Sequence, residues 1–276
     1  MNFDVSARSN KPISAKQYLE IIDYFNKQLV VGAELERNVP CDVSTTQRAL
    51  GCRNNNRDLA SLKKSPSNKY NVAYCYNDGT VTSGNEIVFA GTNENFDWIQ
   101  KRLKLIDDKL DTMNATSYVG NGSTHLSFLT IQEKVLPAIL IKNIWNLSRA
   151  FSSSLYWLTS GDPVRTFRAR GASYNARAFL EKSPASVSIS NFLSVMDRYS
   201  LCNLNKNRTI PSISPIEPEK LAGLFVEFRQ PDCIRVPSAL TSLMFLHKAL
   251  IYKAVDLSRK GCVCLLYTSP SPRDRS

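Results

Sequence analysis

The stretch that decides the fold is VVGAELE, residues 30–36, which alternates in the manner of a β-strand. Successive side chains of a strand point to opposite faces of the sheet. One face of this strand is therefore apolar, with Val31 and Leu35, whereas the opposite face carries Glu34 and Glu36. Like charges on one face repel each other, and burial raises the cost of that repulsion. The stretch predicts a strand whose glutamates need a partner of opposite charge.

Three further stretches predict strands with the same two-faced character. Their polar residues are Glu86 in NEIVF, His125 and Ser127 in THLSFLT, and Glu227 and Arg229 in LFVEFR. If the four strands lie in one sheet, one face of that sheet gathers the carboxylates Glu34, Glu36, Glu86 and Glu227 together with His125 and Arg229.

A divalent cation would offset the repulsion among these carboxylates, because Mg²⁺ prefers oxygen ligands and often binds phosphate groups as well. Arg229 and the basic segment 165–177, which includes Arg168 and Arg170, offer contacts to such phosphates. We therefore interpret the four glutamates as ligands of Mg²⁺ or Mn²⁺ in a site that handles phosphate.

Each signal also has a plainer interpretation. Two glutamates two residues apart on a strand usually lie on a solvated outer face, and the pair Glu227 and Arg229 can form a cross-strand ion pair. A single histidine such as His125 is more often part of a core than a ligand. Only the combination of the four strands favours the metal hypothesis.

Charge and composition narrow the class of protein. The net charge of +11 favours a polyanionic ligand, such as nucleotide phosphates, nucleic acid or an acidic polymer. No apolar run reaches the about 20 residues that a membrane span needs, and no secretory segment is present at the N-terminus, which predicts a cytoplasmic protein.

The cysteines are expected to be reduced thiols, and a zinc site built from Cys41, Cys52 and Cys75 is a less favoured alternative because their spacing is irregular.

The order of the predicted elements favours an α+β fold. Apolar periodicity predicts helices over residues 14–28 and 132–158, a helix that Thr92 or Asn93 caps and that runs to Leu110, and a helix over 237–258. The strands do not alternate regularly with these helices, so we expect a mostly antiparallel sheet with helices packed on one face. Residues 1–263 are predicted to form a single domain in which 37–70 is a loop or insertion, and 264–276 resembles an adaptor-derived tail.

The motifs VGAELE, DGTVTSGNEIVF, GSTHLSF, RYSLCNL and VEFRQ, in this order, resemble those of the amidoligase family. Amidoligases are carboxylate–amine ligases, many of them encoded by phages, that are related to glutamine synthetase and γ-glutamylcysteine ligase. The resemblance covers about residues 29–258. It departs from the family pattern at Ser127, where a second histidine is usual, and in EIVFAG, which lacks the usual Ser-Pro.

The resemblance implies the curved antiparallel sheet of the glutamine synthetase fold and an ATP-dependent ligase that forms an amide through an acyl phosphate. It implies metal ligands at Glu34, Glu36, Glu86 and Glu227, catalytic roles for His125 and Arg229, and substrate contacts from Asp78, Tyr199 and Asn203. Arg229, Arg168 and Arg170 are the candidates for binding the ATP phosphates. The expected partners are a small-molecule or peptide carboxylate and an amine.

Two other functions stay open. Arginines interleaved with aromatic residues around Phe167 and Tyr174 are typical of a basic phage accessory protein that binds nucleic acid without catalysis. A kinase-like phosphotransferase on the same fold would release the phosphorylated acid instead of an amide. The sequence identifies neither the acid, nor the amine, nor the oligomeric state.

Overall fold

The structure is a computed structural model that describes residues 12–52, 68–77, 84–115, 124–130, 212–216, 223–228 and 234–261, with ten single positions between 137 and 158. In the strands at 124–130, 212–216 and 223–228 it describes the backbone and the side chains of Leu126, Val226 and Phe228.

The described strands form one antiparallel sheet. It has six strands in the order β2-β3-β1-β4-β6-β5, and every neighbouring pair is antiparallel. The strands are β1 Leu29–Asn38, β2 Val72–Asn77, β3 Gly84–Thr92, β4 Thr124–Thr130, β5 Ser212–Ile216 and β6 Gly223–Phe228. The predicted α+β class with an antiparallel sheet is therefore confirmed.

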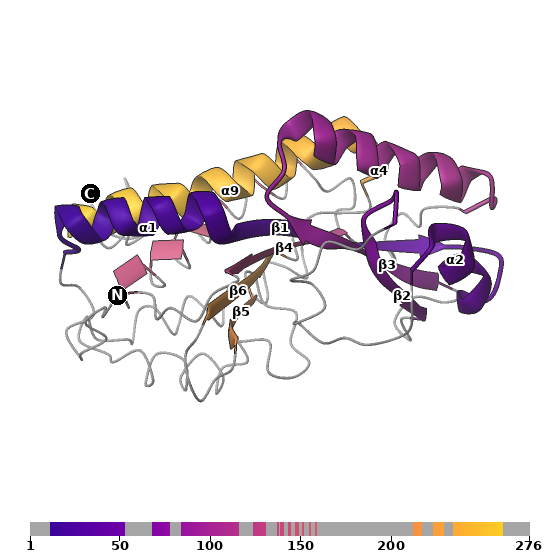
Figure 1. Cartoon of the computed structure of the whole chain (residues 1–276), viewed down its shortest axis with the longest axis horizontal. Coiled ribbons are helices and arrows are strands. Elements are labelled where there is room, and N and C mark those ends of the chain that lie inside the picture. Colours follow the sequence, from indigo (N-terminus) through magenta and orange to yellow (C-terminus); the bar gives the residue numbers. More distant parts are fainter. Residues whose placement is uncertain are drawn as a thin grey trace, which may run out of the picture.

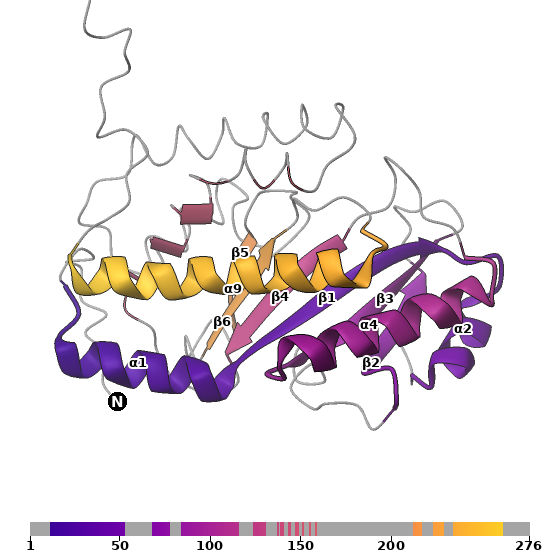
Figure 2. The ribbon, with the colours of Figure 1, turned by 90° about the horizontal axis from the view of Figure 1, so that it is seen from above.

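Helices cover one face of this sheet. They are α1 Ala15–Gln28, α4 Phe96–Asp111 and α9 Pro237–Arg259, which lie together on one side of the strands, while α2 Val43–Leu50 lies near β2 (Figure 1). Seen from above, α9 runs beside α1 and over the strands (Figure 2). This layer confirms the expected packing of helices on one face.

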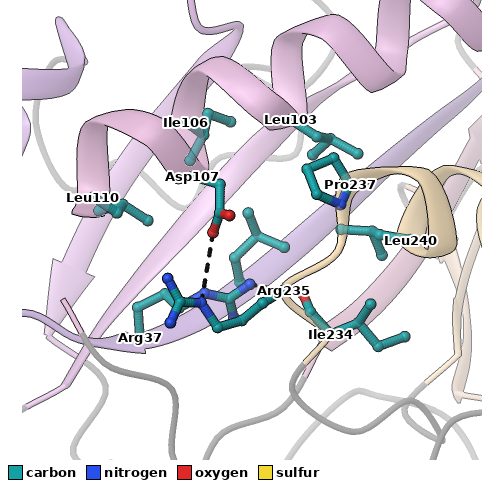
Figure 3. Close-up of a pocket in the computed structure, with 10 residues that line it drawn as sticks. Arg37, Leu103, Ile106, Asp107, Leu110, Ile234, Arg235, Pro237 and Leu240 are labelled. Atoms are coloured by element: carbon teal, nitrogen blue, oxygen red, sulfur yellow. Dashed lines mark hydrogen bonds and ion pairs between the residues drawn. The ribbon is translucent and has the colours of Figure 1, made fainter. Parts of the chain in front are cut away.

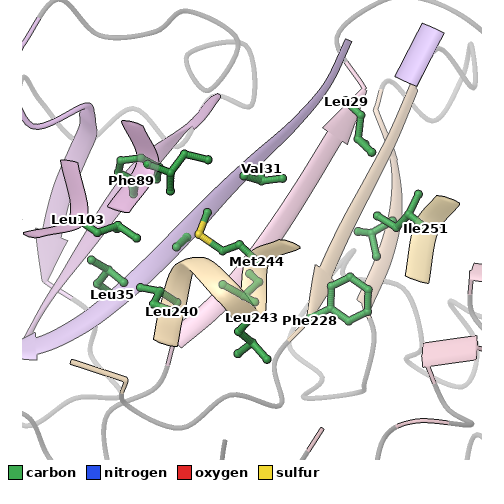
Figure 4. Close-up of a cluster of buried hydrophobic side chains, with 14 of the residues drawn as sticks. Leu29, Val31, Leu35, Phe89, Leu103, Phe228, Leu240, Leu243, Met244 and Ile251 are labelled. Atoms are coloured by element: carbon green, nitrogen blue, oxygen red, sulfur yellow. The ribbon is translucent and has the colours of Figure 1, made fainter. Parts of the chain in front are cut away.

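The apolar face of β1 meets the helix layer. Val31 and Leu35 are 2% and 3% exposed, and they share one core with Leu240, Met244 and Ile251 of α9 (Figure 4). Burying aliphatic side chains of this size stabilises a fold by about 1.5–3 kcal/mol each. The alternation read in residues 30–36 thus decides which face of the sheet is covered.

Local signals set where the helices begin. Ser14 caps α1 through a capping box with Gln17, and Pro237 occupies the first turn of α9. The prediction that Thr92 or Asn93 caps the next helix is wrong, because Asn95 accepts from the backbone N–H of Trp98. Thr92, Asn93 and Asn95 all satisfy the same sequence rule, and the backbone geometry selects Asn95.

Three further segments differ from or extend the predictions. The expected loop at 37–70 begins with the end of β1 and contains α2, whose cap Asp42 accepts from Ser44 and Thr45, which lowers the pKa of its carboxyl to about 2. Strand β5 was not predicted, and its Pro215 is tolerated because β5 is an edge strand of the described sheet. In the expected helix over 132–158, eight of the ten described positions are helical, and five of these are buried in the core: Ile139, Leu140, Ile144, Leu147 and Leu155.

We expect Asn143→Ala to lower the free energy of unfolding by about 1–3 kcal/mol, because a buried hydrogen-bonding partner is lost. Asn143 Nδ2 donates to Ser258 Oγ of α9 at 3.0 Å, and both residues are 0% exposed. Ser148→Ala is the matched control, since Ser148 Oγ donates only within its own helical turn, to Ile144 O. Urea unfolding measures both variants, and equal losses would contradict a special role for the bond to α9.

Candidate functional site

The register of the sheet brings the predicted polar positions onto one face. Glu36 of β1 lies directly opposite Glu86 of β3, and Glu34 lies opposite His125 of β4. One pair further along, Ser127 of β4 lies opposite Glu227 of β6. Paired residues, and residues two apart on one strand, share a face. Four neighbouring strands therefore place these positions on the same face, which we call the polar face.

The polar face is turned away from the helix layer. On β1 the helices cover the face of Val31, Ala33 and Leu35, so the alternating glutamates belong to the other side. Glu36 and Glu86 are nevertheless only 5% and 4% exposed, whereas Glu34 is half-buried. The interpretation of Glu34 and Glu36 as part of a solvated outer face is therefore wrong for Glu36.

A tyrosine extends this arrangement to the next strand. Tyr76 of β2 lies opposite Glu86, and its hydroxyl group donates to Glu86 Oε1. The ring of Tyr76 packs against that of Tyr74, with 5.7 Å between centroids. Tyr76 was not among the predicted site residues. Its alternation with Tyr74 places both on one face of β2, but the sequence does not show which strand lies next to them.

Gly32 lets β1 and β3 approach each other closely. It shares the polar face with Glu34, and a Cβ atom added there would lie 3.0 Å from Phe89 O. The β1–β3 register also shifts between Val31 and Ala33, at this glycine. Any larger residue at position 32 would press on the strand that carries Glu86.

The donors suit Mg²⁺ in the way that phosphate-binding sites use it. Among the side chains that the structure describes, no three His, Cys, Asp or Glu groups lie close enough together to hold a metal ion. Mg²⁺ at phosphate sites is usually bound by one or two carboxylates, with phosphates and water completing its shell. The carboxylates of Glu36 and Glu86, on Cβ atoms about 5 Å apart in such a pair, fit that use.

The side chains of the other predicted site residues lie outside the described part of the chain. For His125 and Glu227 only the backbone position is described, so their roles stay predictions. Nothing in the described part bears on Asp78, Arg168, Arg170, Tyr199, Asn203 and Arg229, nor on the tail at 264–276.

The cysteines offer no support for a zinc site. Cys41, Cys52 and Cys75 are all free, and they form no metal-binding group among the described side chains. Burial raises the pKa of the Cys52 thiol to about 11 and that of Cys75 as well.

A small pocket near the end of β1 has a structural role. Arg37 donates to the backbone oxygens of Glu36 and Ile234, and Arg235 forms an ion pair with Asp107 across 3.7 Å (Figure 3). Burial raises the pKa of Asp107, and the charge of Arg235 opposes that rise. The cavity holds about 10 Å³, room for roughly one water molecule. These contacts fix the segment that leads into α9, and the space is too small for a nucleotide.

Comparisons with known proteins assign no family. No protein-family model matches the sequence, and no curated protein matches it. A solved structure of 3-hydroxy-3-methylglutaryl-coenzyme A reductase from Streptococcus pneumoniae is similar over 99% of this chain and 71% of that one, at 10% identity and a TM-score of 0.24. A second structure of that enzyme covers 97% of this chain and 79% of its own, at 10% identity and a TM-score of 0.22. A likeness this weak carries no argument about fold or function.

Within the described residues, no helix is long and apolar enough to cross a membrane.

Proposed function

We propose that the chain is an ATP-dependent carboxylate–amine ligase of the amidoligase type, with its active site on the polar face. The observation that carries the proposal is the register, which sets Glu36 opposite Glu86 and Glu34 opposite His125, with the position of Glu227 on the same face. These positions come from four separate motifs of the resemblance. Their meeting on one sheet face supports it, because no local sequence rule requires it.

In the proposed reaction, a carboxylate oxygen of the acid attacks the γ-phosphorus of ATP, and ADP leaves. The amine then attacks the acyl carbon of the acyl phosphate, inorganic phosphate leaves, the nitrogen gives up a proton to the phosphate or to solvent, and an amide remains. Phosphoryl transfer depends mostly on positioning and on neutralising charge. Mg²⁺ or Mn²⁺ would supply part of that neutralisation.

In this proposal each predicted site residue has at least one of three roles: binding the metal, catalysis, or contact with the phosphates or substrate. Glu34, Glu36, Glu86 and Glu227 hold the metal ions, and the proposed catalytic residues are His125 and Arg229. Arg229, Arg168 and Arg170 contact the phosphates, while Asp78, Tyr199 and Asn203 contact the substrate. The sheet would then be the curved sheet of the glutamine synthetase fold. The substrates would be a small-molecule or peptide carboxylate and an amine, in the cytoplasm of a cell or of a phage-infected host.

We expect ATP turnover to stop when divalent cations are removed with EDTA and to return with Mg²⁺ or Mn²⁺, because the buried glutamates need a cation to bind phosphate. The measurement is ADP release by the purified chain with glutamate-like acids and a panel of amines, combined with mass analysis of the products. Turnover that persists in EDTA would refute the metal role. A phosphorylated acid that accumulates without amide, although an amine is present, would favour the phosphotransferase alternative.

A further inference from the structure

One contact on the polar face joins a site carboxylate to a residue outside the proposed ligand set. The hydroxyl group of Tyr76 donates to Glu86 Oε1, and the two residues are direct partners in the β2–β3 register. Glu86 is 4% exposed, and Glu36, its neighbour on the other side, is 5% exposed. The buried carboxylate of Glu86 thus lies between a hydrogen-bond donor on β2 and a second carboxylate on β1.

The donor in this contact has less freedom to turn than the acceptor. A tyrosine ring has two side-chain torsions, whereas a glutamate has three and so has more freedom to turn. The Tyr76 ring packs against Tyr74 with 5.7 Å between centroids and an angle of 31° between planes. The ring contact limits how Tyr76 can turn, so its hydroxyl group is the less mobile partner of the flexible Glu86 carboxylate.

The hydrogen bond from Tyr76 opposes the effect of repulsion between Glu36 and Glu86. Glu36 and Glu86 lie opposite each other, and two like charges in a buried environment favour rotation away from one another. A donor on the far side of Glu86 lowers the cost of its charge and selects one orientation. Partners that orient a metal-binding carboxylate in this way typically change metal affinity 10- to 100-fold when they are removed.

We infer that Tyr76 is a positioning residue that holds the Glu86 carboxylate in the orientation needed to share a divalent cation with Glu36. The inference rests on the proposed function, because it takes Glu36 and Glu86 as metal ligands. Tyr76 itself contacts neither the cation nor the substrate, and it acts through Glu86.

Contacts elsewhere on β2 indicate that the hydroxyl group of Tyr76 is not needed to hold this strand in the sheet. Strand β2 pairs with β3 over residues 72–77, and Gln47 Nε2 of α2 donates to Cys75 O at 2.7 Å. Cys75 is itself fully buried in the core. Removal of one hydroxyl group from the opposite face leaves these contacts unchanged, so Tyr76→Phe should fold.

Tyr18→Phe provides a matched control. Tyr18 Oη donates to Asp256 Oδ1 at 2.9 Å, which is the same pairing of a phenol with a carboxylate, but it joins α1 to α9. Both variants therefore lose the same chemical interaction, and only Tyr76→Phe loses it on the polar face.

The experiment is a titration of the full chain with Mg²⁺ alone, followed by thermal unfolding. Binding to the folded state raises the melting temperature in proportion to ln(1 + [Mg²⁺]/Kd), so the Mg²⁺ concentration at which the rise begins lies close to Kd and reports affinity without any turnover. We expect this concentration to rise at least about tenfold in Tyr76→Phe and to stay at the wild-type value in Tyr18→Phe. In a Glu86→Gln background, Tyr76→Phe should have no further effect.

The outcomes separate the inference from the function on which it rests. If the wild type responds to Mg²⁺ and Tyr76→Phe follows the same curve, the positioning role is overturned while the metal site stands. If the wild type does not respond at all, the metal site fails and the positioning role fails with it. A Tyr76→Phe chain that is unfolded without Mg²⁺ would overturn the inference by assigning the hydroxyl group to the fold.

Discussion

Glu36→Gln is expected to lower Mg²⁺-dependent ATP turnover by about 100-fold or more while the chain stays folded. Glutamine has the shape of glutamate without its charge, so the buried pair of Glu36 and Glu86 loses half of its negative charge towards a cation. Loss of a single electrostatic group in a transition-state site typically costs about 10²–10³ in rate. The chain should stay folded, because glutamine keeps the size of glutamate and one of its oxygen acceptors, and the change lowers the repulsion between two carboxylates that are only 5% and 4% exposed.

A second glutamate provides the control for this experiment. Glu20 lies on α1, in the helix layer on the other side of the sheet, and it is half-buried. Glu20→Gln removes the same charge from the chain and should retain turnover. Steady-state ADP release measures activity, and urea unfolding measures stability. If Glu36→Gln turns over at the rate of Glu20→Gln, the carboxylate of Glu36 has no part in catalysis.

Much of the fold follows from periodicity in the sequence. The period of two in residues 30–36 correctly assigned Val31 and Leu35 to the core. The apolar stripe of α4 was predicted to be Phe96, Ile99, Leu103, Ile106 and Leu110, and all of these are buried except Phe96, which is half-buried. Such patterns work because burial selects every second residue of a strand and every third or fourth residue of a helix.

The missed elements are those in which a local signal competes with a tertiary one. Pro215 argues against a strand, yet an edge strand such as β5 can leave one side of its backbone unpaired. The short helix α2 lies in a polar stretch whose apolar residues are few, and its packing near β2 is set by tertiary contacts such as that of Gln47 with Cys75. Neither outcome can be read from the segment itself.

The candidate site also depends on tertiary contacts that a single segment of sequence does not predict. Alternation predicts that Glu34 and Glu36 share a face, but it does not predict that Glu86 lies opposite Glu36, since that depends on strand order and register. The same reason explains why Tyr76 was missed. A tyrosine in a strand is ordinary in composition, and it becomes informative only when its neighbour across the ladder is a buried carboxylate.

The buried histidine of α9 is expected to make the free energy of unfolding depend on pH. His247 is 0% exposed, and its Nδ1 pairs with Leu243 O at 2.8 Å. Its ring packs edge-on against that of Phe228, with 4.3 Å between the ring centroids. Its Nε2 has no hydrogen-bond partner within the described part of the chain. Burial lowers the pKa of His247 to about 4, and the carbonyl of Leu243 opposes this only in part.

We expect acid to destabilise the wild type by about 3 kcal/mol more than His247→Leu. The unfolded histidine binds a proton near pH 6.5 and the folded one near pH 4, so between these values the unfolded state holds more protons. The contribution of the neutral histidine is present in full above pH 6.5 and is lost as the pH falls towards 4, by about 1.4 kcal/mol per pKa unit. Leucine does not titrate, and the carboxylates act in both proteins, so the difference between the two profiles isolates His247. Urea unfolding at intervals from pH 7 to 4 measures it, and parallel profiles would show that position 247 is not buried against β6 as described.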